Sequence, residues 1–484
     1  MVLAACSRRP QRSLERIALL PFDNLTGDAA FDWVSNAGPA VLSEELAGSV
    51  RVLPLRSRSV GTAVLVGATQ LFHCTFSRRG NALRLDFSLE DAEEHRMVAT
   101  GSAEGAVLFV LNTLALKLDP AARPFSTPNQ DALAAWGSGE FERAVTLDPD
   151  FGTAWAFWIS QSAQAGKPEA AALLAERALA RPSLRTAFNK AQIQFALAVL
   201  RKDETARGAA LTELASLAPN DVANLLGLAE IEQHHRRYAG AIQFYQRALA
   251  IEPGNANALN GLGYAQGEKG DLNDAKKSLE AYGLQPDQSN NATDSLGEVY
   301  FMNGRFADAE KYFVQASARD PNFLNGAPLM KASYARWLGG DLPGADALMA
   351  KYLDLRQKQN DSLVFWRQAV WQYSTGRREQ ALATLQKTPR DQAANMERQR
   401  AVWRGEVRLP EDLSQLKAIF ENTNPAADGV PRTLYAAALA RAGKADEARA
   451  LLKLWPLPDS PGDPLLQSLL YPKFLELRKT LGVK

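Results

Sequence analysis

The sequence predicts a small α+β module at the N-terminal end, followed by an all-α solenoid built from helical hairpins. Residues 16–119 contain short apolar runs separated by turn residues, which is the pattern of strands flanked by helices. Between residues 222 and 323 the same residue types return every 34 positions, a period typical of stacked helix pairs. The length of 484 residues exceeds what one hydrophobic core usually holds, in agreement with two such parts.

The composition is that of an ordinary folded chain, with 46% hydrophobic and 23% charged residues. Lys and Arg total 55 against 54 Asp and Glu, a balance that argues against a nucleic-acid binder. Two cysteines and four histidines are few for a disulfide scaffold or a metal centre, so we expect no metal and no cofactor. No apolar run reaches the roughly 20 residues of a membrane-spanning helix.

The first residues suggest where in the cell the protein is located. Leu3-Ala4-Ala5-Cys6 resembles the bacterial lipobox, in which small residues precede a cysteine that becomes the lipidated N-terminus. Because five residues precede Cys6, the signal would lie upstream of the given start, and residues 1–15 would be its remnant and a tether. This resemblance implies lipidation at Cys6 and the periplasmic side of a bacterial envelope, with membrane contact through the lipid alone. The alternative is a cytoplasmic chain with a chance Ala-Ala-Cys.

Within the module, the pattern predicts alternating strands and helices. Alternation is clearest in Leu83, Leu85, Phe87 and Leu89, where every second side chain is apolar. Turn residues occupy 23–28. The expected strands are 17–22, 51–55, 68–76, 83–89 and 96–101, and the expected helices are 31–46 and 104–117.

This order, with the opening phrase Ile17-Ala-Leu-Leu-Pro-Phe-Asp-Asn-Leu-Thr-Gly27, resembles the TolB N-terminal-like domain over residues 16–119. The stretch 57–67 is shorter than the connection expected in that domain, so its second helix is expected to be missing or vestigial. The resemblance implies an interaction module without catalytic activity. No glycine-rich phosphate loop follows any of the predicted strands.

The repeat is clearest in residues 222–255, 256–289 and 290–323. Small residues at the eighth and twentieth positions let the two helices of a hairpin approach closely. Large apolar residues at the seventh and twenty-fourth positions fill the space that remains, and proline ends the second helix. The matching sets are Leu228, Leu262 and Leu296; Ala229, Gly263 and Gly297; Ala241, Ala275 and Ala309; Tyr245, Leu279 and Phe313; and Pro253, Pro286 and Pro321.

This period and residue set resemble the tetratricopeptide repeat (TPR), which implies a right-handed superhelix of helical hairpins with a concave groove. Weaker units flank the three clear ones. We therefore predict a linker at 120–130, repeats over 131–455, and a break with a capping helix at 456–484.

The resemblance also implies which residues line the groove. Asparagine amides can bond both the donor and the acceptor of an extended peptide, which suits the capture of a protein or peptide partner. The Lys and Arg residues of a chaperone-type carboxylate clamp are absent from the matching positions. The candidate groove residues are Glu230, Gln233, His234, Asn257, Asn260, Tyr264, Asn291, Asp294 and Glu298.

The sequence offers no catalytic constellation. His73 and Cys74 are neighbours in a predicted strand, so their side chains face opposite ways and cannot pair. We therefore expect a non-enzymatic scaffold for protein–protein interaction in a bacterial envelope assembly. The alternative is a regulatory or sensory subunit of a bacterial signalling system whose effector is a separate chain.

Overall fold

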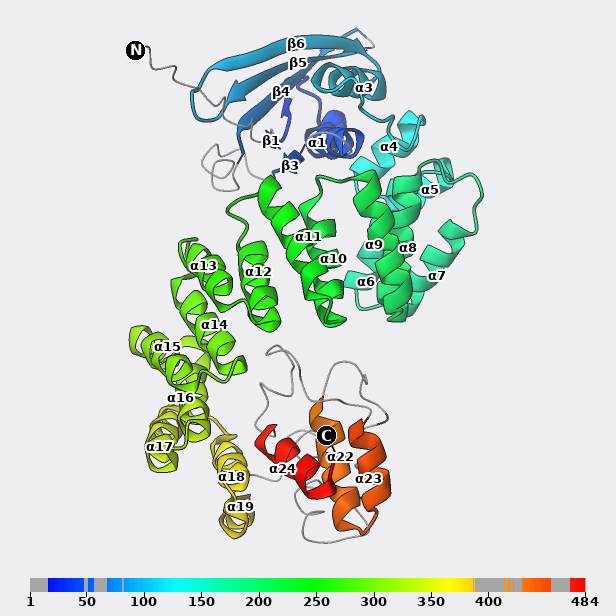
Figure 1. The fold of residues 1–484 in the computed structure, drawn as a ribbon. Helices are drawn as coiled ribbons and strands as arrows, with labels where there is room; N and C mark the ends of the chain where they lie inside the picture. Colours follow the sequence, from blue (N-terminus) through cyan, green and yellow to red (C-terminus); the bar gives the residue numbers. More distant parts are fainter. Residues whose placement is uncertain are drawn as a thin grey trace, which may run out of the picture. The chain divides into compact units, whose positions relative to one another are not determined.

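The structure is a computed structural model that describes residues 16–47, 51–55, 68–80, 82–385, 387, 413–414, 417, 421, 429–453 and 471–483. Cys6, the segment 57–67 and residues 456–470 of the predicted C-terminal break and capping helix lie outside these residues. The chain forms two compact units, residues 1–231 with 244–255, and residues 232–243 with 256–484. Figure 1 labels the helices and strands of both units.

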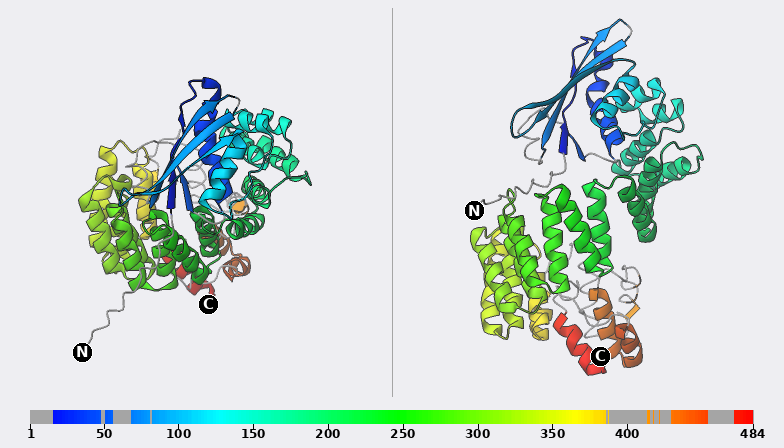
Figure 2. Two further views of the ribbon diagram at one scale, coloured as in Figure 1. Left: turned by 90° about the horizontal axis from the view of Figure 1, so that it is seen from above. Right: turned by 45° about the horizontal axis from the view of Figure 1, so that its top comes forward.

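The N-terminal module is built on a mixed sheet with the strand order β3-β1-β4-β5-β6, while β2 pairs with β4. Strand β1 lies parallel to β3 and to β4, and β4, β5 and β6 form an antiparallel meander. Figure 2 shows the sheet from two directions. The strands are β1 (Arg16–Leu19), β2 (Asp23–Asn24), β3 (Arg51–Pro54), β4 (Gln70–Arg79), β5 (Ala82–Asp91) and β6 (Met97–Gly105).

Helices α1 (Trp33–Leu46) and α3 (Val107–Leu118) cover one face of this sheet, and a short 3₁₀ helix, η1 (Ala29–Phe31), precedes α1 (Figure 1). The predicted alternation in β5 is confirmed, because Leu83, Leu85, Phe87 and Leu89 are all buried in one core with both helices. Likewise Cys74 is buried, while the neighbouring His73 is half-buried.

Two local predictions were wrong. Residues 104 and 105 belong to β6 rather than to the following helix, because the ladder with β5 continues as far as the pair Leu83 and Gly105. The turn predicted at 23–28 begins later, since Asp23 and Asn24 pair with Thr75 and Phe76 of β4. The turn itself then uses the Asn24 side chain, whose Oδ1 accepts from the Thr26 N–H at 2.9 Å.

A proline inside α1 fixes how the chain leaves β1. Pro39 has no N–H, so the Ser35 carbonyl four residues earlier loses its helical partner. That carbonyl instead accepts from the backbone N–H of Phe22 at 3.0 Å. Gly38 makes room for the contact, because a Cβ there would lie 2.4 Å from the Phe22 ring. The segment after β1 is thereby held against the first half of α1.

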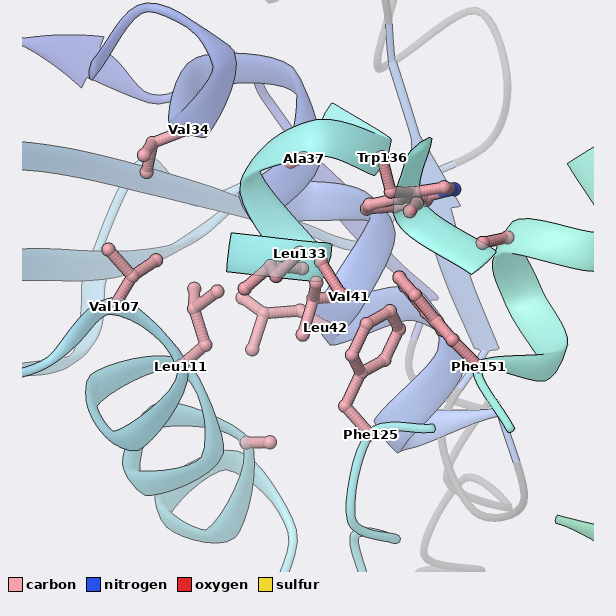
Figure 3. Close-up of a cluster of buried hydrophobic side chains, with 14 of the residues drawn as sticks. Val34, Ala37, Val41, Leu42, Val107, Leu111, Phe125, Leu133, Trp136 and Phe151 are labelled. Atoms are coloured by element: carbon pink, nitrogen blue, oxygen red, sulfur yellow. The ribbon is translucent and has the colours of Figure 1, made fainter. Parts of the chain in front are cut away.

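The hydrophobic core of the module continues into the first hairpins without a break. Phe125, inside the predicted linker, packs its ring 5.8 Å from Trp136 and 5.6 Å from Phe151 (Figure 3). The boundary between module and hairpins predicted at 120–130 stays a prediction, and the described core runs through it without a gap. The hairpin helices that directly follow the module are α4 (Gln130–Gly137), α5 (Phe141–Leu147), α6 (Gly152–Gln164), α7 (Pro168–Leu179), α8 (Ala187–Arg201) and α9 (Glu204–Leu217).

The clear repeats form the predicted hairpins. Gly263 and Gly297 permit the close approach of their helices, since a Cβ there would lie 2.5 Å from Leu279 and 2.6 Å from the Phe313 ring, respectively. Their helices are α10 (Val222–His234), α11 (Tyr238–Ile251), α12 (Ala256–Lys269), α13 (Leu272–Gly283), α14 (Ser289–Met302) and α15 (Phe306–Arg319).

The second unit continues after a 3₁₀ turn, η2 (Phe323–Gly326), with further helical hairpins. No helix among the described residues is long and apolar enough to cross a membrane. The remaining elements are α16 (Ala327–Leu338), α17 (Leu342–Lys358), α18 (Val364–Ser374), α19 (Arg378–Leu385), α22 (Gly429–Arg441), α23 (Ala445–Lys453) and α24 (Tyr471–Leu481).

Candidate partner-binding face

The first helices of consecutive hairpins in the second unit, α12, α14 and α16, carry polar side chains that meet one another. Tyr264 and Glu298 lie 34 residues apart, so they occupy the same position in adjacent repeats and become neighbours when the repeats stack. We call the joined side chains of Tyr264, Asp294, Glu298 and Lys331 the inter-repeat network.

Lys331 on α16 connects this network to α14. Its Nζ donates to Asp294 Oδ2 at 2.6 Å and also to Glu298 Oε1. The ammonium lies 5.6 Å from the centre of the Phe313 ring, a distance at which a cation and an aromatic face attract each other. The Tyr264 hydroxyl on α12 donates to the second oxygen, Oε2, of Glu298. Glu298 thus accepts hydrogen bonds from the first helices of the preceding hairpin and of the following one.

The charges of the network are only partly hydrated. Burial raises the pKa of Asp294, an effect that the nearby Lys331 ammonium opposes and the Glu298 carboxylate reinforces. Burial alone would lower the pKa of Lys331, but the two carboxylates outweigh it and the pKa rises. Burial, and then the adjacent Glu298, raises the pKa of the Tyr264 hydroxyl. Lysine and tyrosine therefore keep their protons at neutral pH and act as hydrogen-bond donors.

A second polar pair lies at the ends of α10 and α12. Gln233 Nε2 donates to Glu268 Oε2 at 2.8 Å. Burial raises the pKa of Glu268 to about 7, although the hydrogen bond from Gln233 and then the charge of Arg236 act in the opposite direction. With the two carboxyl groups of the network, this places three acidic side chains near one ammonium and one guanidinium, and Glu298 is the most exposed of the three acids.

Two acceptor atoms on this face have no hydrogen-bond partner. Asp294 is 3% exposed, and its Oδ1 is buried without a donor, as is Oδ1 of Asn260. Buried acceptors without a donor are costly, by about 1–3 kcal/mol each.

The structure brings some of the predicted residues together and leaves others apart. Tyr264, Asp294 and Glu298 belong to the network, and Gln233 pairs with Glu268. Asn291 is engaged internally, because its Nδ2 donates to the Tyr282 hydroxyl at 2.8 Å.

Three other predicted residues lie outside the network. Asn257 is exposed on α12, and His234 is exposed at the end of α10. Glu230 belongs to the first unit, where its carboxylate lies 3.8 Å from Arg207.

Sequence reasoning missed Lys331. The repeat that contains it departs from the strict period, since its two carboxylate partners precede it by 37 and 33 residues. A lone lysine in an irregular unit gives no signal of its own. A search for one cation among the acidic positions of neighbouring repeats would have found it.

The histidine–cysteine neighbours in β4 do not form a nucleophilic pair. Burial, reinforced by Asp86 and then Asp23, raises the pKa of the Cys74 thiol far above its usual range. The thiolate that a nucleophilic cysteine needs is therefore suppressed. His73 lies 3.9 Å from Glu90.

The comparisons agree with the repeat. A family model described as tetratricopeptide repeat matches residues 233–293. A TPR repeat-containing protein of Pseudomonas aeruginosa is 38% identical over 76 residues, which are 15% of this chain and 13% of that protein. This chain therefore matches a small part of the length of that relative.

Solved structures include helical-repeat proteins of low sequence identity. A tetratricopeptide repeat protein from Parabacteroides merdae is 13% identical with a TM-score of 0.36, covering 61% of this chain and 98% of that one. Yeast Tom70 is 12% identical with a TM-score of 0.39, covering 77% of this chain and 90% of that one.

Proposed function

We propose that this protein, whose chain carries tetratricopeptide repeats, is a non-catalytic scaffold that binds an extended segment of a partner protein along α12, α14 and α16. Proteins with this repeat generally bind other proteins. The observation that carries the proposal is the inter-repeat network, a row of hydrogen-bonding side chains that joins three stacked helices. An extended peptide presents backbone N–H groups at regular intervals, and these can approach a row of acceptors on stacked helices.

The charge of the face favours a basic partner. Glu298 is partly exposed beside Lys331, and the three carboxyl groups outnumber the ammonium and the guanidinium near them. A lysine or arginine of the partner would meet complementary charge here, which speeds association and disfavours acidic competitors. We expect the bound segment to carry at least one such residue.

Site-specific photo-crosslinking in the host cell tests this proposal. A photoreactive phenylalanine analogue placed at Asn257, exposed on α12, should crosslink the full-length protein to a discrete partner. The same analogue at Lys277, whose side chain is 76% exposed on α13, serves as the matched control.

The proposal predicts a crosslinked band at position 257 that is absent at position 277, and a partner peptide containing Lys or Arg. Equal crosslinking at both positions, or a product from position 277 alone, would contradict binding along α12.

The location of the scaffold is a separate proposal that rests on the first residues of the sequence. We propose that Cys6 is lipidated and anchors the protein on the periplasmic side of the envelope. Palmitate labelling of the protein, expressed from the extended upstream reading frame, should be sensitive to globomycin and lost in Cys6→Ala. Absence of labelling in the wild-type protein would place the scaffold elsewhere and favour the regulatory alternative.

A further inference from the structure

Two cavities in the first unit lie where the module meets the first hairpins. One measures about 530 Å³ and is lined by Pro21 and Leu55, which lie just after the parallel strands β1 and β3. The other measures about 350 Å³ and is lined by the C-terminal half of α1 together with α6 and α8. Both fall in the size range of small-molecule sites, and the carboxyl ends of parallel strands are a common place for such sites.

Aromatic rings connect the two cavities. Trp136 and Phe157 line both, and their rings meet edge to face with centres 5.5 Å apart. Phe157 is 46% exposed, which is unusual for a phenylalanine beside a core, and Phe141 lies 5.7 Å from it. The indole Nε1 of Trp136, at the edge of the cluster in Figure 3, is buried and has no acceptor.

The smaller cavity has a carboxylate in its wall, held by a built polar network. Glu44 Oε2 accepts from Thr153 Oγ1 at 2.5 Å, and Oε1 lies 3.4 Å from Asn189 Nδ2. Thr153 is bonded in turn to Ser126, and both Ser126 and Asn189 are fully buried. Ser43 Oγ, in the same wall, is buried without a partner. Such a network fixes the carboxylate without neutralising it.

The charged groups around Glu44 favour a cation. Asp221 lines the same cavity, and Glu45 follows Glu44 on α1. The nearby positive group is Arg123, whose guanidinium lies over the Phe188 ring at 5.2 Å. Glu44 and Asp221 both line the cavity, whereas Arg123 does not, and aromatic side chains complete the lining. Carboxylates and aromatic faces together are the usual partners of an organic ammonium group.

We propose that this pair of cavities binds an amine attached to an aromatic ring, with the ammonium at Glu44 and the ring beside Trp136 and Phe157. The site lies in the first unit and is independent of the partner-binding face. Burial raises the pKa of Glu44, and a bound ammonium would favour its carboxylate form.

Isothermal titration of the full-length protein with tryptamine tests the proposal. Tryptophol, which replaces the ammonium with a hydroxyl, and indole-3-acetate, which carries a negative charge, should bind at least about tenfold more weakly, as expected for losing a hydrogen bond to a charged group.

Substitutions distinguish this site from non-specific binding. Glu44→Gln preserves the hydrogen bond from Thr153 and should weaken tryptamine binding by about tenfold. Phe157→Ala should weaken it too, whereas Glu213→Gln, an exposed carboxylate on α9, should leave it unchanged. Equal affinity for all three indoles, unchanged affinity in Glu44→Gln, or no heat with tryptamine at millimolar concentration would overturn the proposal.

A free aromatic amine and a peptide with adjacent aromatic and lysine side chains both offer a ring and an ammonium group. Tighter binding of N-acetyl-Trp-Lys-amide than of tryptamine would assign the site to a peptide. The reverse order would assign it to a small metabolite.

Discussion

At the residue scale, the structure contains a carboxylic acid whose surroundings oppose its ionisation. Glu45 on α1 is 1% exposed, and neither of its carboxyl oxygens makes a hydrogen bond. Burial, and then the neighbouring Glu44, raises its pKa from 4.5 to about 8. Glu45 is therefore protonated in the folded protein at neutral pH, while in the unfolded chain it is ionised.

This difference predicts a pH-dependent stability. Below pH 4.5 both states are protonated and the contribution to stability is complete; as the pH rises towards 8, the unfolded state loses its proton first and stability falls. Each pH unit costs about 1.4 kcal/mol, on the order of 5 kcal/mol in all. Glu45→Gln should match the wild type near pH 5 and exceed it near pH 8 in urea unfolding.

Glu213→Gln, exposed on α9, is the control and should follow the wild-type curve. If wild type and Glu45→Gln lost stability in parallel between pH 5 and 8, Glu45 would not be the buried acid described here.

At the scale of the element, the close approach of paired helices depends on glycines that ordinary helix propensity would disfavour. Alanine is normally better than glycine in a helix by about 1 kcal/mol. At Gly297 on α14, however, a Cβ would lie 2.6 Å from two atoms of the Phe313 ring. At Gly208 on α9 the nearest atom is Ile231 Cδ1, at an ordinary 3.9 Å.

The same substitution should therefore have opposite effects at these two positions. Gly297→Ala should destabilise its hairpin by about 1–3 kcal/mol through overpacking. Gly208→Ala should stabilise α9 by about 0.5–1 kcal/mol. Hydrogen exchange of the α14 and α9 amides measures each helix directly. Stabilisation by both variants would mean that Gly297 is not a packing requirement.

The repeat was predictable because each hairpin needs small and large residues at fixed positions, such as Gly263 opposite Leu279. The periodicity also placed Tyr264 and Glu298 on one face. It could not place Lys331, whose helix begins after an irregular turn at Phe323–Gly326. Nor could it foresee the Glu44 network, since Thr153 and Asn189 are 109 and 145 residues away along the chain.

At the scale of the whole molecule, the first compact unit combines sheet, linker segment and hairpins in one hydrophobic core. Sequence alone suggested a boundary at 120–130, because prolines and weak periodicity are typical of linkers. Phe125 shows why such a pattern is an incomplete guide. Phe125 is 6% exposed, and its ring contacts both Trp136 and Phe151.

Removing that ring should weaken both parts of the unit together. Phe125→Ala should cost about 3–5 kcal/mol, and amides in β4 and in α6 should lose hydrogen-exchange protection in parallel. Phe109→Ala on α3, where the side chain is 62% exposed, should change stability by less than about 0.5 kcal/mol. Loss of protection in α6 with β4 unaffected would show that the module folds separately from the hairpins.

The proposed function requires that the face of α12, α14 and α16 binds a basic, extended segment of a partner. The most direct measurement is the affinity of the crosslinked partner segment, as a synthetic peptide, for wild type, Glu298→Gln and Glu280→Gln in the full-length protein. The amide oxygen introduced by Glu298→Gln can still accept from Tyr264, and Asp294 still holds Lys331. Glu280, 57% exposed on α13, is the matched control.

Glu298→Gln should weaken binding of the peptide by about tenfold, whereas Glu280→Gln should leave the affinity unchanged. Equal affinities for all three proteins would contradict the proposed function.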